Sequence, residues 1–246
     1  IPDCMRVWGI DSGVRHFVGG SDYGTVRCAT FMGREILRKS LAGRTKLPAV
    51  TGDVSHVVHV PPSLLAELRS ELPESLLGSE FVSKYGSHGD PITTIAPDTR
   101  YAVRESTGHP IGEHHRVSVF ESMLRAAGSA GSASAVGSKT ELELLGELMY
   151  QSHASYSTIG LGSDATDLIV KLVRSRGPAS GLYGAKITGG GSGGTVCVMG
   201  DASPLAEASL QQVLADYQAL SGHEPYVVIG SSAGALEFGH LRIRFE

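Results

Sequence analysis

A run of glycines between two strand-like segments constrains the fold of this chain more than any other feature. The run consists of Gly189, Gly190, Gly191, Ser192, Gly193 and Gly194. Glycine permits positive φ and a close approach of the backbone to a ligand, so this glycine loop could direct several N–H groups at one anion. A valine at position 190 or 191 is therefore expected to impair function, because a β-branched side chain cannot follow such a backbone. A hairpin that merely turns explains the run equally well at this point.

Two common nucleotide-binding motifs do not fit the glycine loop. Gly189, Gly191 and Gly194 have the spacing G-x-G-x-x-G, but that fingerprint requires a helix directly after it. Residues 195–199 are instead rich in β-branched side chains and predict a strand. No Lys-Ser or Lys-Thr pair follows the glycines, which excludes a P-loop. The glycine loop is therefore expected to join two strands, at residues 183–188 and 195–199.

The apolar pattern of the whole chain predicts a mixture of strands and helices. Further strands are expected at residues 4–11, 226–229 and 241–245. Helices are expected at residues 23–39, from residue 62 for a short stretch, and at residues 114–127, 140–157, 164–176 and 204–220. The remaining residues between 40 and 100, together with residues 128–139, are expected to be connecting segments. Because strands and helices do not alternate strictly, the pattern favours an α+β fold.

The overall composition excludes several classes of protein. With 246 residues, 41% of them hydrophobic, and a formal net charge of -4, the chain has neither the profile of a disordered protein nor that of a nucleic-acid binder. No apolar run reaches the roughly 18 residues of a membrane span, and the first residues lack the layout of a signal peptide. Cys4, Cys28 and Cys197 are widely separated and are expected to be reduced thiols, which favours a cytoplasmic protein.

Polar residues gather between the first predicted strand and the first predicted helix, a position where small ligands often bind. Tyr23 lies at the entrance of that helix, where its phenol could bond a sugar hydroxyl. Taken alone, these residues are better explained by structure, with Asp11 and Asp22 as caps and Tyr23 as a packed aromatic side chain. None of the ten histidines lies in a zinc-binding spacing, and His153 is expected to be a hydrogen-bonded core residue.

Several segments together resemble the GHMP sugar kinases, the galactokinase-like superfamily. Residues 184–198 (GAKITGGGSGGTVCV) are similar to the third conserved motif of that family. Residues 145–155 (LGELMYQSHAS) resemble a helix of galactokinases, and residues 7–23 are more similar to the branch that acts on L-arabinose. The resemblance covers most of the chain and is weakest near residues 40–100 and 128–139.

This resemblance implies the fold and the extent of the domain. Residues 1–246 would form the C-terminal half of a GHMP kinase, an α+β lobe in which helices pack on an antiparallel, ferredoxin-like sheet. The N-terminal lobe of such kinases carries a Pro-x-x-x-Gly-Leu-Ser-Ser-Ser phosphate loop and, in galactokinases, a catalytic aspartate in a Met-Asp-Gln segment; neither motif occurs here. ATP and Mg²⁺ are therefore expected to be held mainly by an N-terminal lobe of the same polypeptide. No catalytic or metal-binding residue is expected in this chain.

The resemblance also implies site residues and a reaction. Tyr23 and Asp22 are expected to contact the sugar, and the glycine loop is expected to pack beside the phosphate site. The reaction would transfer the γ-phosphoryl group of ATP to the anomeric hydroxyl of L-arabinose. Residues 161–167 lack the Cys-Pro-Glu turn of galactokinases, which favours L-arabinose over D-galactose. A galactokinase and a catalytically inactive sugar-binding or regulatory module are the alternatives.

Overall fold

The computed structural model describes residues 1–15, 21–42, 54–129, 139–230 and 235–244, with backbone only at residues 21–22, 127–129 and 235–236. The strands in these ranges are β1 (Met5–Asp11), β2 (Leu76–Leu77), β3 (Arg100–Tyr101), β4 (Leu182–Ile187), β5 (Thr195–Asp201) and β6 (Val227–Val228). The helices are α1 (Ser21–Ala42), α2 (Pro62–Leu68), α3 (Gly78–Tyr85), α4 (Val103–Ser129), α5 (Lys139–Thr158), α6 (Asp164–Arg176), α7 (Pro204–Ser221) and α8 (Ala235–Phe238). Short 3₁₀ turns are η1 (Val57–His59), η2 (Arg69–Glu71) and η3 (Pro178–Ser180).

An antiparallel sheet with the strand order β4-β5-β1-β6 forms the centre of the fold. β1 pairs with β5 along its whole length, from Met5 opposite Asp201 to Asp11 opposite Thr195. β4 and β5 form a hairpin that the glycine loop closes, as predicted. With α6 before β4 and α7 between β5 and β6, the sheet has the ferredoxin-like connectivity of strand, helix, strand, strand, helix, strand. The predicted α+β class is confirmed.

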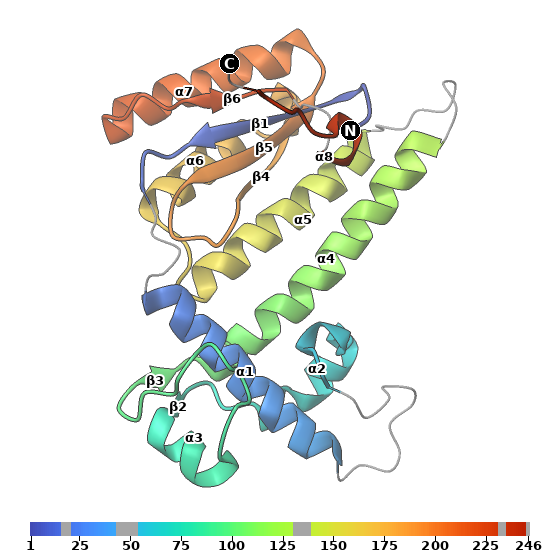
Figure 1. Cartoon of the computed structure of the whole chain (residues 1–246). Coiled ribbons are helices and arrows are strands. Elements are labelled where there is room, and N and C mark those ends of the chain that lie inside the picture. Colours follow the sequence, from blue (N-terminus) through green and yellow to red (C-terminus); the bar gives the residue numbers. More distant parts are fainter. Residues whose placement is uncertain (16–20, 43–53, 130–138, 231–234, 245–246) are drawn as a thin grey trace.

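Side chains of the sheet alternate between two apolar layers, because successive residues of a strand point to opposite faces. On one face, Trp8 and Val198 belong to a core shared with α6 and α7. On the other face, Met199 packs with side chains of α5 and of the second half of α4 (Figure 1). α5 approaches β4 so closely that a Cβ on Gly146 would lie 2.0 Å from the carbonyl oxygen of Tyr183.

A second core lies in the helical part of the chain, drawn below the sheet in Figure 1. Its buried side chains come from α1, α2, α3, the start of α4 and the segments between them, and include Met32, Leu37, Val60, Leu68, Leu72, Phe81 and Ile111. α1 and α4 cross closely, since a Cβ on Gly33 would overlap the Thr107 hydroxyl. Residues 54–100 were expected to be mostly connecting segments, but these contacts make them a packed part of the fold.

Helix α4 begins at Val103, well before its predicted start at residue 114. Pro110 lies inside it, although proline ordinarily interrupts a helix because it has no N–H group. The carbonyl oxygen of Ser106, which that N–H would have bonded, accepts a hydrogen bond from the Thr30 hydroxyl of α1 at 2.8 Å. A tertiary contact thus replaces the missing helical bond. At 27 residues, α4 is about 40 Å long and reaches both cores.

The end of the chain differs from the prediction. Residues 241–244 do not form the strand expected at 241–245. Leu241 and Ile243 are 77% and 74% exposed, so the apolar side chains at these alternate positions are not buried against a sheet. Residue 245 and most of the predicted loop at 128–139 lie outside the described residues. Within the described part of the chain, no helix is both long enough and apolar enough to cross a membrane.

Candidate functional site

The glycine loop has a backbone conformation that favours glycine at nearly every position. φ is positive at Gly189 (65°), Gly191 (85°), Gly193 (131°) and Gly194 (78°). Ser192 has a φ of 62° and is the only non-glycine residue with positive φ in the described chain. Its hydroxyl is buried there without a hydrogen-bond partner. Backbone strain and unsatisfied buried groups concentrate at functional sites, so both observations mark this loop as a candidate site.

Backbone hydrogen bonds hold the glycine loop to two neighbouring segments. The N–H of Ser192 donates to the carbonyl oxygen of Leu161 at 2.6 Å, and the N–H of Gly194 donates to that of Val14 at 3.0 Å. Neither group is available to an anion, so the loop is not a cradle in which every N–H group faces a ligand. The N–H groups of residues 189–191 have no acceptor within the described residues, and they are the donors that a ligand could use.

Gly190 and Gly191 differ in the side chains they can tolerate. A Cβ on Gly191 would lie 2.5 Å from the carbonyl oxygen of Leu161 and 3.1 Å from the ring of Tyr156. Because φ is also positive there, the expectation that this position requires glycine is confirmed. A Cβ on Gly190 would meet only the ring of Tyr23, at 3.9 Å, and φ is not positive. Neither reason for glycine applies at Gly190, so an alanine fits there, and the effect of a valine at Gly190 stays a prediction.

Tyr23, the predicted sugar contact, lies against the glycine loop at the start of α1, and its side chain is 38% exposed. One turn further along α1, the guanidinium of Arg27 donates hydrogen bonds to the carboxylate of Asp90 at 2.8 and 2.9 Å. Arg27 holds the pKa of the buried Asp90 well below its usual range. Asp90 and, more weakly, the Tyr23 phenol raise the pKa of Arg27. Tyr23 is thus next to a fixed ion pair. The structure describes the backbone of Asp22 but not its side chain.

Sequence reasoning missed two further residues at the glycine loop, Tyr156 and its neighbour His109. The Tyr156 hydroxyl donates to the carbonyl oxygen of Gly189 at 3.1 Å. The His109 ring packs edge-on against the Tyr156 ring, with 4.6 Å between centroids, and His109 Nδ1 lies 2.8 Å from Ser155 Oγ. Burial lowers the pKa of His109 to about 4, so the ring is neutral near pH 7. No local sequence signal marks these contacts, because the partners are far apart along the chain.

His153 is a hydrogen-bonded core histidine, as predicted. Its Nδ1 accepts from the N–H of Ile187 at 3.3 Å, and its Nε2 lies 3.0 Å from Asp167 Oδ1. Burial lowers the pKa of His153, so the neutral ring donates its Nε2–H to Asp167. This contact fixes the end of β4, directly before the glycine loop.

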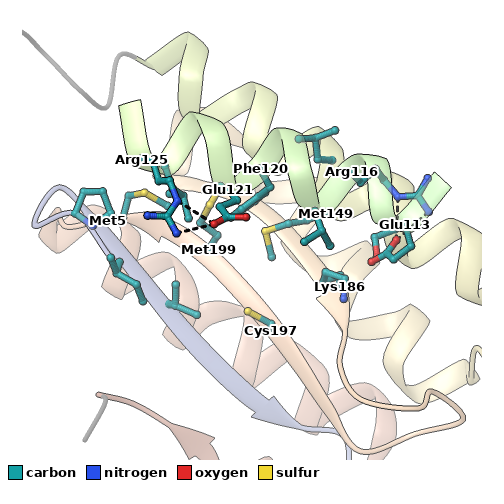
Figure 2. A pocket seen from close by; sticks show the side chains of 17 residues that line it. Met5, Glu113, Arg116, Phe120, Glu121, Arg125, Met149, Lys186, Cys197 and Met199 are labelled. Carbon is teal, nitrogen blue, oxygen red and sulfur yellow. Dashed lines mark hydrogen bonds and ion pairs between the residues drawn. The ribbon is translucent and has the colours of Figure 1, made fainter. Parts of the chain in front are cut away.

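A cavity of about 740 Å³ lies between α4 and the sheet face that α5 also covers (Figure 2). Most of its lining is apolar and includes Met5, Phe120, Met149, Cys197 and Met199. At one end, Glu113 pairs with Arg116 at 2.8 Å, and Lys186 lies nearby. Apolar walls cannot replace the hydration of a triphosphate, so this cavity does not suit the phosphate groups of a nucleotide.

The described side chains offer no candidate metal centre. Within the described residues, no group of three or more His, Cys, Asp or Glu side chains converges as a metal site requires. Burial raises the pKa of the Cys28 and Cys197 thiols, so neither is an activated nucleophile. The Tyr23 phenol and the backbone N–H groups of the glycine loop can together bind a polar ligand.

Comparison with known families identifies the domain that carries this site. Residues 132–217 match the family model described as GHMP kinases C terminal. The range contains α5, α6, the β4–β5 hairpin and the glycine loop. This part of the chain is a GHMP kinase C-terminal domain, and the family expected from the motifs is confirmed.

Two individual proteins extend the similarity to nearly the whole chain. The chain is 38% identical to L-arabinokinase of Arabidopsis thaliana over 272 residues, which cover 99% of this chain and 25% of that protein. The crystal structure of Lactococcus lactis galactokinase complexed with galactose matches with a TM-score of 0.63 and 15% identity, over 92% of this chain and 44% of that one. The galactokinase match shows a shared fold. The chain spans about a quarter of the length of the curated relative.

Proposed function

We propose that this chain is part of an ATP-dependent sugar 1-kinase of the galactokinase-like family and that its sugar is L-arabinose. The enzyme would transfer the γ-phosphoryl group of ATP to the anomeric hydroxyl. The observation that carries the proposal is the placement of Tyr23 against Gly190, which joins the expected sugar contact to the loop expected beside the phosphates. The 38% identity to L-arabinokinase supports the choice of sugar.

In this proposal, the residues of the chain bind and orient the substrate. The Tyr23 phenol bonds a sugar hydroxyl, Asp22 is a second sugar contact, and the N–H groups of residues 189–191 supply further donors beside them. Phosphoryl transfer depends mainly on such positioning and on charge stabilisation. ATP, and Mg²⁺ to neutralise its phosphate charge, are assigned to an N-terminal lobe, because the phosphate-loop motif of the family does not occur in this chain. We place the enzyme in the cytoplasm.

A sugar panel in a coupled ADP-release assay on the intact protein tests the proposal. L-arabinose should give the highest kcat/KM, and NMR of the product should locate the phosphate on the anomeric oxygen. A preference for D-galactose would favour the galactokinase alternative, which the shared fold leaves open. Sugar binding measured by calorimetry without any ADP release would favour an inactive binding module.

The isolated 246-residue chain should release no ADP above background with any sugar. The phosphate-loop and Met-Asp-Gln motifs of the family do not occur in it, so the groups that position ATP are lacking. Circular dichroism on the same sample shows whether the chain is folded. Robust phosphorylation by the folded chain alone would contradict the assignment of ATP and Mg²⁺ to an N-terminal lobe.

A further inference from the structure

The end of helix α5 holds the glycine loop at several points. The Tyr156 hydroxyl bonds the carbonyl oxygen of Gly189 at 3.1 Å, and its ring lies 3.1 Å from the position that a Cβ on Gly191 would occupy. Leu161 donates its N–H to the Tyr156 carbonyl oxygen at 2.9 Å and accepts from the N–H of Ser192 at 2.6 Å. Gly189, Gly191 and Ser192 are thus held by one short segment of chain.

Tyr156 is itself fixed by neighbours from α4 and β4. The neutral His109 ring packs edge-on against it, and His109 Nδ1 in turn lies 2.8 Å from Ser155 Oγ. The ammonium group of Lys186 lies 5.5 Å from the centre of the Tyr156 ring. Burial raises the pKa of Tyr156, so its hydroxyl keeps the proton that it donates to Gly189. A side chain with both its ring and its hydroxyl engaged is well suited to fix a loop.

The glycine loop connects Tyr156 to Tyr23. Gly190 lies between the two residues that Tyr156 contacts, and its backbone faces the ring of Tyr23. The Cβ position of Gly190 lies 3.9 Å from the Tyr23 ring, and that of Gly191 lies 3.1 Å from the Tyr156 ring, so adjacent loop residues face the two tyrosines. Glycine-rich backbone has many accessible conformations, so ordering it requires contacts from outside the loop. Tyr156 supplies such contacts at Gly189 and Gly191, the residues before and after the one that faces Tyr23.

We propose that Tyr156 is a positioning residue of the sugar site. By holding the carbonyl group of Gly189, it keeps Gly190 against Tyr23 and so fixes where the Tyr23 phenol meets the sugar. Tyr156 need not touch the reacting atoms. The inference rests on the proposed function, because it requires the sugar to bind at Tyr23.

Tyr156→Phe tests the proposal, since it keeps the ring and removes only the hydroxyl that bonds the loop. Tyr150→Phe is the matched control, because Tyr150 lies on the same helix but packs against Arg174, with 4.7 Å from the guanidinium carbon to the ring centre. Tyr156→Phe should lower kcat/KM for the sugar about two- to tenfold, the effect of one neutral hydrogen bond, without changing KM for ATP. It should also accelerate hydrogen exchange at the amides of Ser192 and Gly194. The control variant should change none of these quantities.

The outcomes separate this inference from the proposed function. Unchanged exchange in Tyr156→Phe, or faster exchange with unchanged sugar kinetics, would overturn the positioning role. If the wild-type protein releases no ADP with any sugar, the proposed function fails. The inference about Tyr156 is then decided by the sugar affinity of the two proteins in calorimetry. A two- to tenfold weaker affinity in Tyr156→Phe than in the wild type supports it. Equal affinities, or no sugar binding by the wild type, overturn it.

Discussion

Replacing Gly191 by alanine should destabilise the protein much more than the same change at Gly190. An alanine at Gly191 must adopt a φ of 85° and place its methyl group 2.5 Å from the carbonyl oxygen of Leu161. The left-handed conformation costs an L-residue about 1–2 kcal/mol. Moving the loop to relieve the contact would break the bond from the Ser192 N–H to Leu161, at a further cost of about 0.5–1.5 kcal/mol. The expected loss in the free energy of unfolding is about 1.5–3.5 kcal/mol.

Gly190→Ala is the control for this prediction, because its methyl group meets nothing closer than the Tyr23 ring at 3.9 Å. This variant should be neutral or up to about 1 kcal/mol more stable, since alanine reduces the entropy of the unfolded chain. Thermal unfolding of the 246-residue chain, followed by circular dichroism, measures both. At about 2–4 °C per kcal/mol, Gly191→Ala should lower Tm by about 3–14 °C. Equal Tm values for the two variants would refute the assigned loop conformation.

Three further predictions concern single side chains around the glycine loop. If the proposed kinase function holds, Tyr23→Phe in the full-length protein should lower kcat/KM for the sugar about two- to tenfold and leave KM for ATP unchanged. Steady-state kinetics with each substrate varied in turn tests this, and a shift confined to ATP would contradict it. The pKa of His109 is lowered by burial to about 4, so between about pH 6.5 and 4 the unfolded chain binds a proton that the folded protein does not. Stability contributed by the neutral ring is fully present above this window and should fall by up to about 3 kcal/mol as the pH drops through it. In denaturant titrations at several pH values, His109→Gln should flatten this dependence, and an unchanged dependence in this variant would contradict the assignment. Ser192→Gly removes positive-φ strain and an unpartnered hydroxyl, and should raise the free energy of unfolding by about 1 kcal/mol in denaturant titrations. A loss of stability would show that the hydroxyl has a partner.

Elements that depend on local pattern were predictable from the sequence. β1 was expected at residues 4–11 and is formed by Met5–Asp11, because alternate side chains of this strand enter two different apolar layers. The strand after the glycine loop was predicted from its β-branched residues. Local pattern was misleading at Leu241 and Ile243. Their side chains alternate as in a strand, but they are exposed and pack against no sheet in the described chain.

Elements that depend on contacts between distant residues were not predictable in this way. The start of α4 was missed because Pro110 signals a break, and the Thr30 hydroxyl that compensates for it comes from another helix. Residues 54–100 contain many turn-forming residues, yet Asp90 is buried there by its pairing with Arg27. The contact of Tyr156 with the glycine loop likewise joins two elements that only the folded chain brings together.

The length of α4 has a mechanical consequence. Val103 and Ile111 belong to the helical core, whereas Phe120 and Leu124 pack in the layer beneath the sheet. α1, which carries the proposed sugar contact Tyr23, is joined to the same helix by the hydrogen bond from Thr30. A ligand that shifts the start of α1 is therefore expected to shift α4 as well, although Pro110 is the position at which this helix bends most easily. Ligand binding at the glycine loop should therefore slow hydrogen exchange in the second half of α4 as well as in the loop itself.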